Sequence, residues 1–101
     1  MPSFRATLQI TGLLPGHAPE EVMDMAVATV GSAHVVEANQ LDIAGGIPRI
    51  TVRFMVEASE YDAENQYARN AAVSMAHGVG QVATTGAVRS YRRSAGKWLP
   101  L

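Results

Sequence analysis

The sequence predicts an α+β fold in which a four-stranded antiparallel sheet carries two helices on one face. Two observations lead to this prediction. Residues 5–10 (RATLQI) and residues 49–54 (RITVRF) repeat one strand-like pattern, in which polar and apolar side chains alternate. Each run is followed by an alanine-rich amphipathic segment that ends at a glycine, Gly31 in the first half and Gly78 in the second. We therefore predict two related halves within a single domain spanning residues 1–101.

The first half is expected to contain one strand and one helix. Its strand has apolar side chains at every second position, a period that marks a sheet with one buried face. Pro15 and Gly16 form a turn signal, and Pro19 suits the first position of a helix because its missing N–H costs nothing there. The apolar positions of the helix recur every three or four residues and predict a buried stripe. This stripe comprises Val22, Met25, Ala26, Thr29 and Val30.

The second half is expected to contain two strands before its helix. A weakly alternating strand is predicted over residues 34–43 and a clear one over residues 49–56, joined by the turn-forming segment 44–48. Ser59 suits the cap of the second helix, and Asp62, three residues later, supports that assignment. The expected buried stripe of this helix comprises Ala63, Tyr67, Ala71 and Met75.

A fourth strand is expected after the second helix. It lies within residues 82–93 and is interrupted at Gly86. A turn follows, so residues 94–101 are predicted to form a short C-terminal hairpin or tail.

The expected order is thus strand, helix, strand, strand, helix, strand. Each helix is expected to cross right-handedly over the sheet, so that both helices cover one face and leave the other open. This pattern resembles the ferredoxin-like βαββαβ plait, in which the first and third strands are antiparallel neighbours at the centre of the sheet. The resemblance is one of pattern and implies architecture only, because this fold carries many unrelated activities.

Composition excludes several kinds of site. The chain has no cysteine, which excludes a disulfide scaffold, a thiolate zinc site and a cysteine nucleophile, and leaves a reducing cytoplasm as the expected compartment. No apolar run approaches the roughly 20 residues that cross a bilayer. The net charge of −1 predicts no bulk attraction to nucleic acid or to membranes. We therefore expect a cytoplasmic protein with no membrane contact and no cofactor.

The open sheet face is the candidate binding surface. The outward positions of the first and third strands carry arginine, threonine and glutamine and no carboxylate. Such a face is either simply solvated, as antiparallel sheets often are, or covered by an anionic or hydrogen-bonding partner. Further basic residues lie in the fourth strand, and tryptophan is a residue type that anchors interfaces. The candidate partner-binding residues are Arg5, Thr7, Gln9, Arg49, Thr51, Arg53, Arg89, Arg92, Arg93 and Trp98.

Two features near this surface have alternative interpretations. Trp98 either closes the core from a short edge strand or serves as an interface anchor, and Pro100 would discourage further strand pairing at that edge. Glu37 and Asp42, on the expected second strand, are expected to pair with arginines of a neighbouring strand.

The sequence favours a small binding or assembly module over an enzyme. It contains no nucleophile triad order and no phosphate-binding or dinucleotide-binding motif. His17, His34 and His77 lie in three separate segments without metal-ligand spacing, so no catalytic or metal-binding residue is predicted. We expect the protein to self-associate as a homo-oligomer, or to dock a protein partner, through the open face and the basic fourth strand.

Two other functions stay open. The same arginines could contact nucleic-acid phosphates, although base stacking is not expected because the outward positions of the central strands lack aromatic residues. The third interpretation is a small dimeric α+β-barrel enzyme, in which two such domains pack sheet against sheet.

Overall fold

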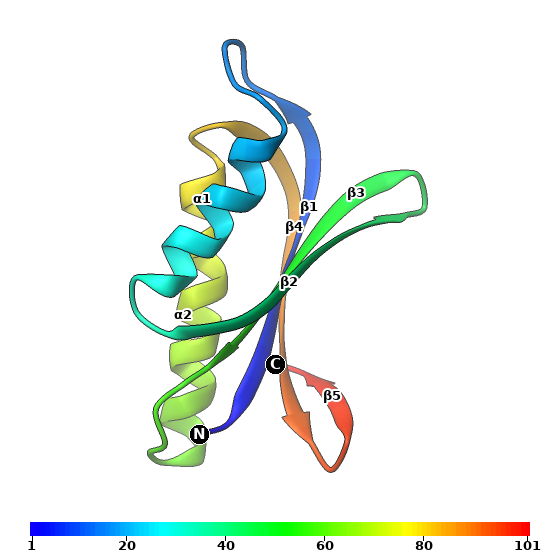
Figure 1. The fold of residues 1–101 in the computed structure, drawn as a ribbon. Helices are drawn as coiled ribbons and strands as arrows, with labels where there is room; N and C mark the ends of the chain where they lie inside the picture. The colour runs from blue at the N-terminus through cyan, green and yellow to red at the C-terminus, as the bar shows by residue number, and fades with distance from the viewer.

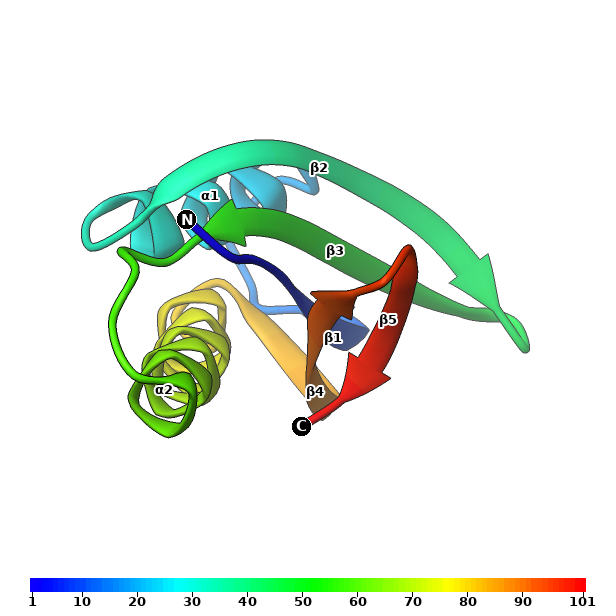
Figure 2. The ribbon, with the colours of Figure 1, turned by 90° about the horizontal axis from the view of Figure 1, so that it is seen from below.

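The computed structural model describes residues 1–101, which form a five-stranded antiparallel sheet and two helices. Both helices pack against one face of the sheet (Figure 1). The elements are β1 (Ser3–Leu13), α1 (Glu20–Gly31), β2 (Val35–Ala44), β3 (Ile47–Met55), α2 (Tyr61–Val79), β4 (Ala83–Ser94) and β5 (Lys97–Pro100). The strand order is β2-β3-β1-β4-β5, and every neighbouring pair is antiparallel. The view from below places α1 and α2 on the same side of the sheet (Figure 2), which leaves the opposite face open.

The sheet has one strand more than the sequence predicted. β5 pairs with β4 from Ser94–Lys97 to Tyr91–Pro100, so the prediction of a four-stranded ferredoxin-like plait is wrong. Ala95 and Gly96 both have positive φ, at 49° and 78°, and such a two-residue turn returns the chain directly beside the preceding strand. The sequence left a hairpin and a tail open for residues 94–101, because four residues are too few to display an alternating pattern, and the structure shows the hairpin.

The repeated segments of the sequence pair with each other at the centre of the sheet. Thr7 of β1 lies opposite Thr51 of β3, and Arg5 lies opposite Arg53. The residues that alternate with these along both strands face the helices and form the core, where the Phe4 and Phe54 rings stack with centroids 6.0 Å apart. The largest fully buried side chains are those of Phe4, Phe54, Leu8, Ile50, Met75, Val30, Val52, Val56 and Val79.

The two helices differ in how well their buried stripes were predicted. α1 buries Val22, Ala26 and Val30, as expected. In α2 the prediction was wrong at Tyr67, which is 53% exposed, while Glu64 and Asn65 are buried instead. Sequence reasoning assigns such polar residues to the surface, and their burial depends on a partner from β4 that is described below. Neither helix combines the length and the apolarity that a membrane span requires.

α1 and α2 are in close contact where Gly78 faces Thr29. A Cβ atom at Gly78 would collide with the Thr29 hydroxyl oxygen. That hydroxyl donates a hydrogen bond to the Met25 carbonyl at 2.8 Å and is therefore held in place. Gly78 thus has a packing role in addition to lying near the end of its helix.

We predict that Gly78→Ala destabilises the protein even though alanine is the better helix former. The helix preference would contribute about 1 kcal/mol, but overpacking at a helix contact costs about 1–3 kcal/mol. Urea denaturation measures the net change in the free energy of unfolding. In a Thr29→Ala background the collision is absent, so Gly78→Ala should become neutral or stabilising there. An increase in stability from Gly78→Ala alone would contradict this close contact.

Candidate functional site

The β4–β5 hairpin carries Trp98 over the open face of the sheet. The indole ring lies 4.2 Å from the Arg5 Cζ atom, 5.1 Å from that of Arg93 and 5.3 Å from that of Arg53. Because these arginines come from β1, β4 and β3, β5 turns across the face instead of extending the sheet flat (Figure 2). Trp98 does lie in an edge strand, but it is not part of the core cluster, so of the two alternatives for Trp98 the one in which it closes the core is wrong.

A groove of about 190 Å³ lies beside Trp98 on this face. Thr7 and Thr51 form its floor, and each is only 8% exposed because longer side chains surround it. Arg5 and Tyr91 line the groove together with Trp98. Across the floor, β2 and β3 contribute Gln40, Asp42 and Arg49. The open face is therefore concave, with hydroxyl groups below and cationic and aromatic groups around them.

Two arginines of the groove region have acidic partners from β2. The Arg49 Nε atom lies 3.2 Å from Asp42 Oδ1, and Arg49 Nη2 donates a hydrogen bond to Asp42 Oδ2 at 3.3 Å. The Arg53 Nε atom lies 3.6 Å from Glu37 Oε1, an ion pair that is too long for a hydrogen bond. The predicted pairing of Glu37 and Asp42 with arginines is confirmed. The same pairs show that the open face as a whole is not free of carboxylates, because β2 supplies two.

The face nevertheless keeps an excess of positive charge. Arg5, Arg89 and Arg93 have no carboxylate within 4.0 Å. Arg89 pairs in register with Thr7 and Arg93 with Trp98, so all of them share the open face. Five arginines against two carboxylates leave three uncompensated positive charges on this face, in a chain whose net charge is −1. Uncompensated positive charge is thus concentrated on the open face, although the protein as a whole is slightly negative.

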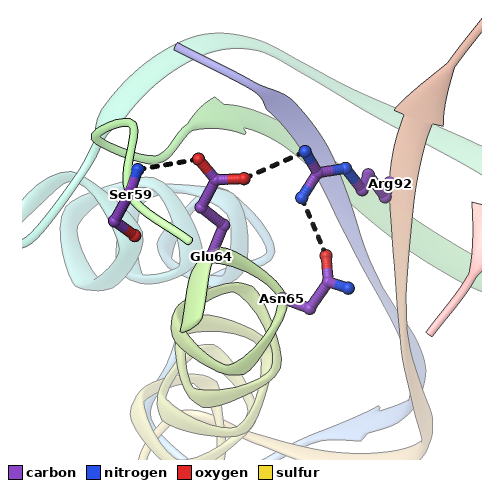
Figure 3. A network of polar contacts seen from close by, with 4 residues as sticks. All are labelled: Ser59, Glu64, Asn65 and Arg92. Atoms are coloured by element: carbon purple, nitrogen blue, oxygen red, sulfur yellow. Dashed lines mark hydrogen bonds and ion pairs between the residues drawn. The ribbon is translucent and has the colours of Figure 1, made fainter. Parts of the chain in front are cut away.

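Arg92 belongs to the opposite face, which corrects its placement among the candidate binding residues. Its register partner is Phe4, whose side chain is in the core. Arg92 donates hydrogen bonds to Glu64 Oε1 at 2.9 Å and to Asn65 Oδ1 at 3.0 Å (Figure 3). Successive residues of a strand point to opposite faces, so Arg92 cannot share a face with Arg93. Arg92 connects β4 to the first turns of α2 and has a structural role.

Glu64 joins this network to the start of α2. Its second carboxylate oxygen accepts a hydrogen bond from the Ser59 backbone N–H at 2.8 Å (Figure 3). This bond, and secondly Arg92, hold the pKa of Glu64 below its ordinary value, although burial acts in the opposite direction. The prediction that Ser59 caps the helix is wrong, since Glu60 occupies the cap position and Ser59 contributes its backbone instead.

We predict that Glu64→Gln lowers the melting temperature at neutral pH and weakens the acid dependence of stability. A carboxyl group whose pKa is lower in the folded state contributes stability above its unfolded pKa. That contribution is lost as the pH falls through the folded pKa, so the difference between wild type and variant should shrink between about pH 5 and pH 3. Thermal unfolding across this range measures it. Glu57→Gln is the control, because Glu57 is exposed and has no ion-pair partner. A difference that is constant with pH would contradict the assignment.

Sequence reasoning placed Gln9 in the site and left Tyr91 out. Gln9 lies on the open face, but its side-chain oxygen accepts the Ala87 N–H at 3.1 Å, where the β1–β4 register is irregular. Its role is therefore to support the bulged strand. Tyr91 does line the groove, and the two-residue period that relates it to Arg89 and Arg93 is the signal that could have identified it.

The histidines lie apart from the groove. His17 Nδ1 is 3.2 Å from Glu21 on the same turn of chain, and His77 lies in the last turn of α2. The His34 ring lies against Phe54 with centroids 5.6 Å apart, and burial lowers the pKa of His34. No three histidine or carboxylate side chains gather in a way that could hold a metal ion.

Comparisons of this chain with protein-family models, with curated proteins and with solved structures found no match. The geometry and the charge of the open face are therefore the features that indicate what the protein does.

Proposed function

We propose that this protein is a non-enzymatic binding module that docks an extended, acidic segment of a protein partner in the groove of its open sheet face. The observation that carries the proposal is the cluster around Trp98. One indole is surrounded by three arginines, and two of these, Arg5 and Arg93, lack an acidic partner within the chain. An acidic segment would supply the missing charges.

The chemistry of the groove suits a peptide. A guanidinium that stacks on an aromatic ring keeps its N–H edge free to bind a carboxylate through two hydrogen bonds. Arg5 is stacked in this way on Trp98. The hydroxyls of Thr7 and Thr51 and the amide of Gln40 offer both donors and acceptors, which a peptide backbone requires. Tryptophan, tyrosine and arginine are also the residues that contribute most energy at protein interfaces.

The shape of the groove favours an extended segment. One turn of a helix is 5.4 Å long and 10–12 Å across with its side chains, so it fills roughly 400–600 Å³, which is more than the volume of about 190 Å³ in the groove. Sheet-against-sheet packing needs an unobstructed face, with the two sheets about 10 Å apart. The β5 hairpin stands over this face and obstructs such packing (Figure 2). Docking of a segment is therefore favoured over face-to-face self-association and over a dimeric barrel enzyme.

Nucleic acid is the second candidate, because the groove places two aromatic side chains, Trp98 and Tyr91, beside cationic ones. One feature disfavours it. The guanidinium of Arg5 lies over the Trp98 ring at 4.2 Å and competes with a base for that surface. The cytoplasmic location expected from the composition stays a prediction.

The proposal predicts that an acidic peptide binds and changes the fluorescence of Trp98, the only tryptophan of the chain. A peptide of alternating glutamate and serine should give a saturable change, and its affinity should fall as salt is raised because exposed charges are screened. The matched peptide of glutamine and serine should give no change. A double-stranded or single-stranded oligonucleotide that binds more tightly than the acidic peptide at the same ionic strength would replace the proposal with the nucleic-acid alternative.

Variants of unpaired arginines locate the binding site. Arg5→Glu and Arg93→Glu should each reduce peptide affinity by about tenfold or more, since each reverses a charge facing the ligand. Arg69→Glu is the matched control, because Arg69 is an exposed arginine of α2 outside the groove, and this variant should bind as the wild type does. Equal losses in all three variants would show a nonspecific charge effect and count against the groove.

A further inference from the structure

We propose that two copies of this chain form a dimer by pairing their β2 strands edge to edge, antiparallel about a two-fold axis at Leu41. The two five-stranded sheets then become one continuous sheet. The interface adjoins the groove at Gln40 and Asp42, but it is formed by the free backbone edge of β2 and by Leu41 on the helix-bearing side, so the proposal does not depend on peptide binding. It rests on the contrast between the two sheet edges, on the apolar side chains exposed along β2, and on the register that their charges allow.

The two edges of the sheet are protected to different degrees. β5 has only four residues, begins with Lys97 and ends with Pro100, and short strands, lysine and proline are the features by which proteins prevent unwanted pairing. β2 has ten residues and contains no lysine, arginine or proline. Its one irregularity lies between Val36 and Ala38, so residues 38–44 form a regular strand whose outer edge has no partner.

Exposed apolar side chains accompany this free edge. Leu41 and Ile43 lie on the helix-bearing side of the sheet, yet they are 63% and 65% exposed. Figure 1 shows the reason, because the β2–β3 hairpin projects beyond the end of α1 and no helix covers it. Leu41 also borders an apolar groove of about 350 Å³ that Leu13 and Met23 line. An exposed edge with such side chains is a site of strand addition unless a partner covers it.

The sequence of β2 suits a second copy of itself in one register. With the axis at Leu41, each Leu41 faces its own equivalent, and each Ile43 lies diagonally beside the other copy's Leu41. On the other face, Asp42 lies opposite Gln40 of the second copy, and no two carboxylates are directly opposed. With the axis at Asp42, the two Asp42 carboxylates would lie directly opposite each other and repel. Moving the axis to Gln40 would place Leu41 opposite Asn39 and Ile43 opposite Glu37.

Cysteine cross-linking tests both the dimer and its register, because the natural chain has no cysteine. Directly opposed residues of antiparallel strands have Cα atoms about 4.5–5.5 Å apart, which is within disulfide reach. Leu41→Cys should therefore form a disulfide-linked dimer under mild oxidation. In Asn39→Cys the two thiols would lie roughly 14 Å apart along the strand, so this control should cross-link at least tenfold more slowly. Equal rates, or a faster reaction of Asn39→Cys, would overturn the register and the proposal.

The oligomeric state provides an independent measurement. Sedimentation equilibrium of the wild type should show a monomer–dimer equilibrium. Leu41→Lys brings two positive charges together at the axis and should yield a monomer, with its fold checked by circular dichroism. Val73→Lys is the matched control, since Val73 is 50% exposed on α2, and this variant should dimerise as the wild type does. A wild type that is monomeric at all concentrations, or a Leu41→Lys variant that still dimerises, would overturn the proposal. Because Leu41 lies on the helix-bearing side of the sheet, away from the groove, Leu41→Lys should still bind the acidic peptide.

Discussion

β1 and β3 lie at the centre of the sheet, and the register between them decides which side chains each face of the protein presents. Phe4 lies opposite Phe54 and Leu8 lies opposite Ile50, so the apolar set of both strands points to the helices. The same register places Thr7 opposite Thr51 on the other face. A shift of one residue would turn the apolar side chains to solvent and the arginines toward the helices. The free energy gained by burying apolar side chains therefore holds the register in place.

This register also creates a cost, and β5 and β2 offset it. Arg5 lies directly opposite Arg53, and like charges in that position destabilise a sheet by up to about 1 kcal/mol. Trp98 contacts both guanidinium groups, and each such contact contributes about 0.5–1 kcal/mol at an exposed site. Glu37 of β2 lies beside Arg53. The fifth strand therefore stabilises the arginines and shapes the groove in which we propose that a partner docks.

Arg92 and Arg93 show how closely structure and candidate function adjoin in this small protein. They are consecutive in β4 and point to opposite faces. Arg92 is held by Glu64 and Asn65 and anchors α2 to the sheet, whereas Arg93 lies beside Trp98 without an acidic partner. Two neighbouring arginines of one strand therefore have different roles, one structural and one in candidate binding. Composition alone does not distinguish them.

Local patterns in the sequence determined most of the framework. Alternating polar and apolar residues in segments 4–10 and 49–56 identified the central strands and the polar face of the sheet. The three-to-four-residue spacing of apolar side chains identified the buried stripe of α1. Both patterns could be recognised because each depends only on the geometry of one segment. The tertiary structure alone decided the pairing of β5, the position of Trp98 over the open face, and the burial of Glu64. These features join residues distant in the chain, such as Glu64 and Arg92, and the contact that offsets the cost of removing both charged groups from water forms only when folding brings the two side chains together. Periodicity within one segment carries no information about such contacts.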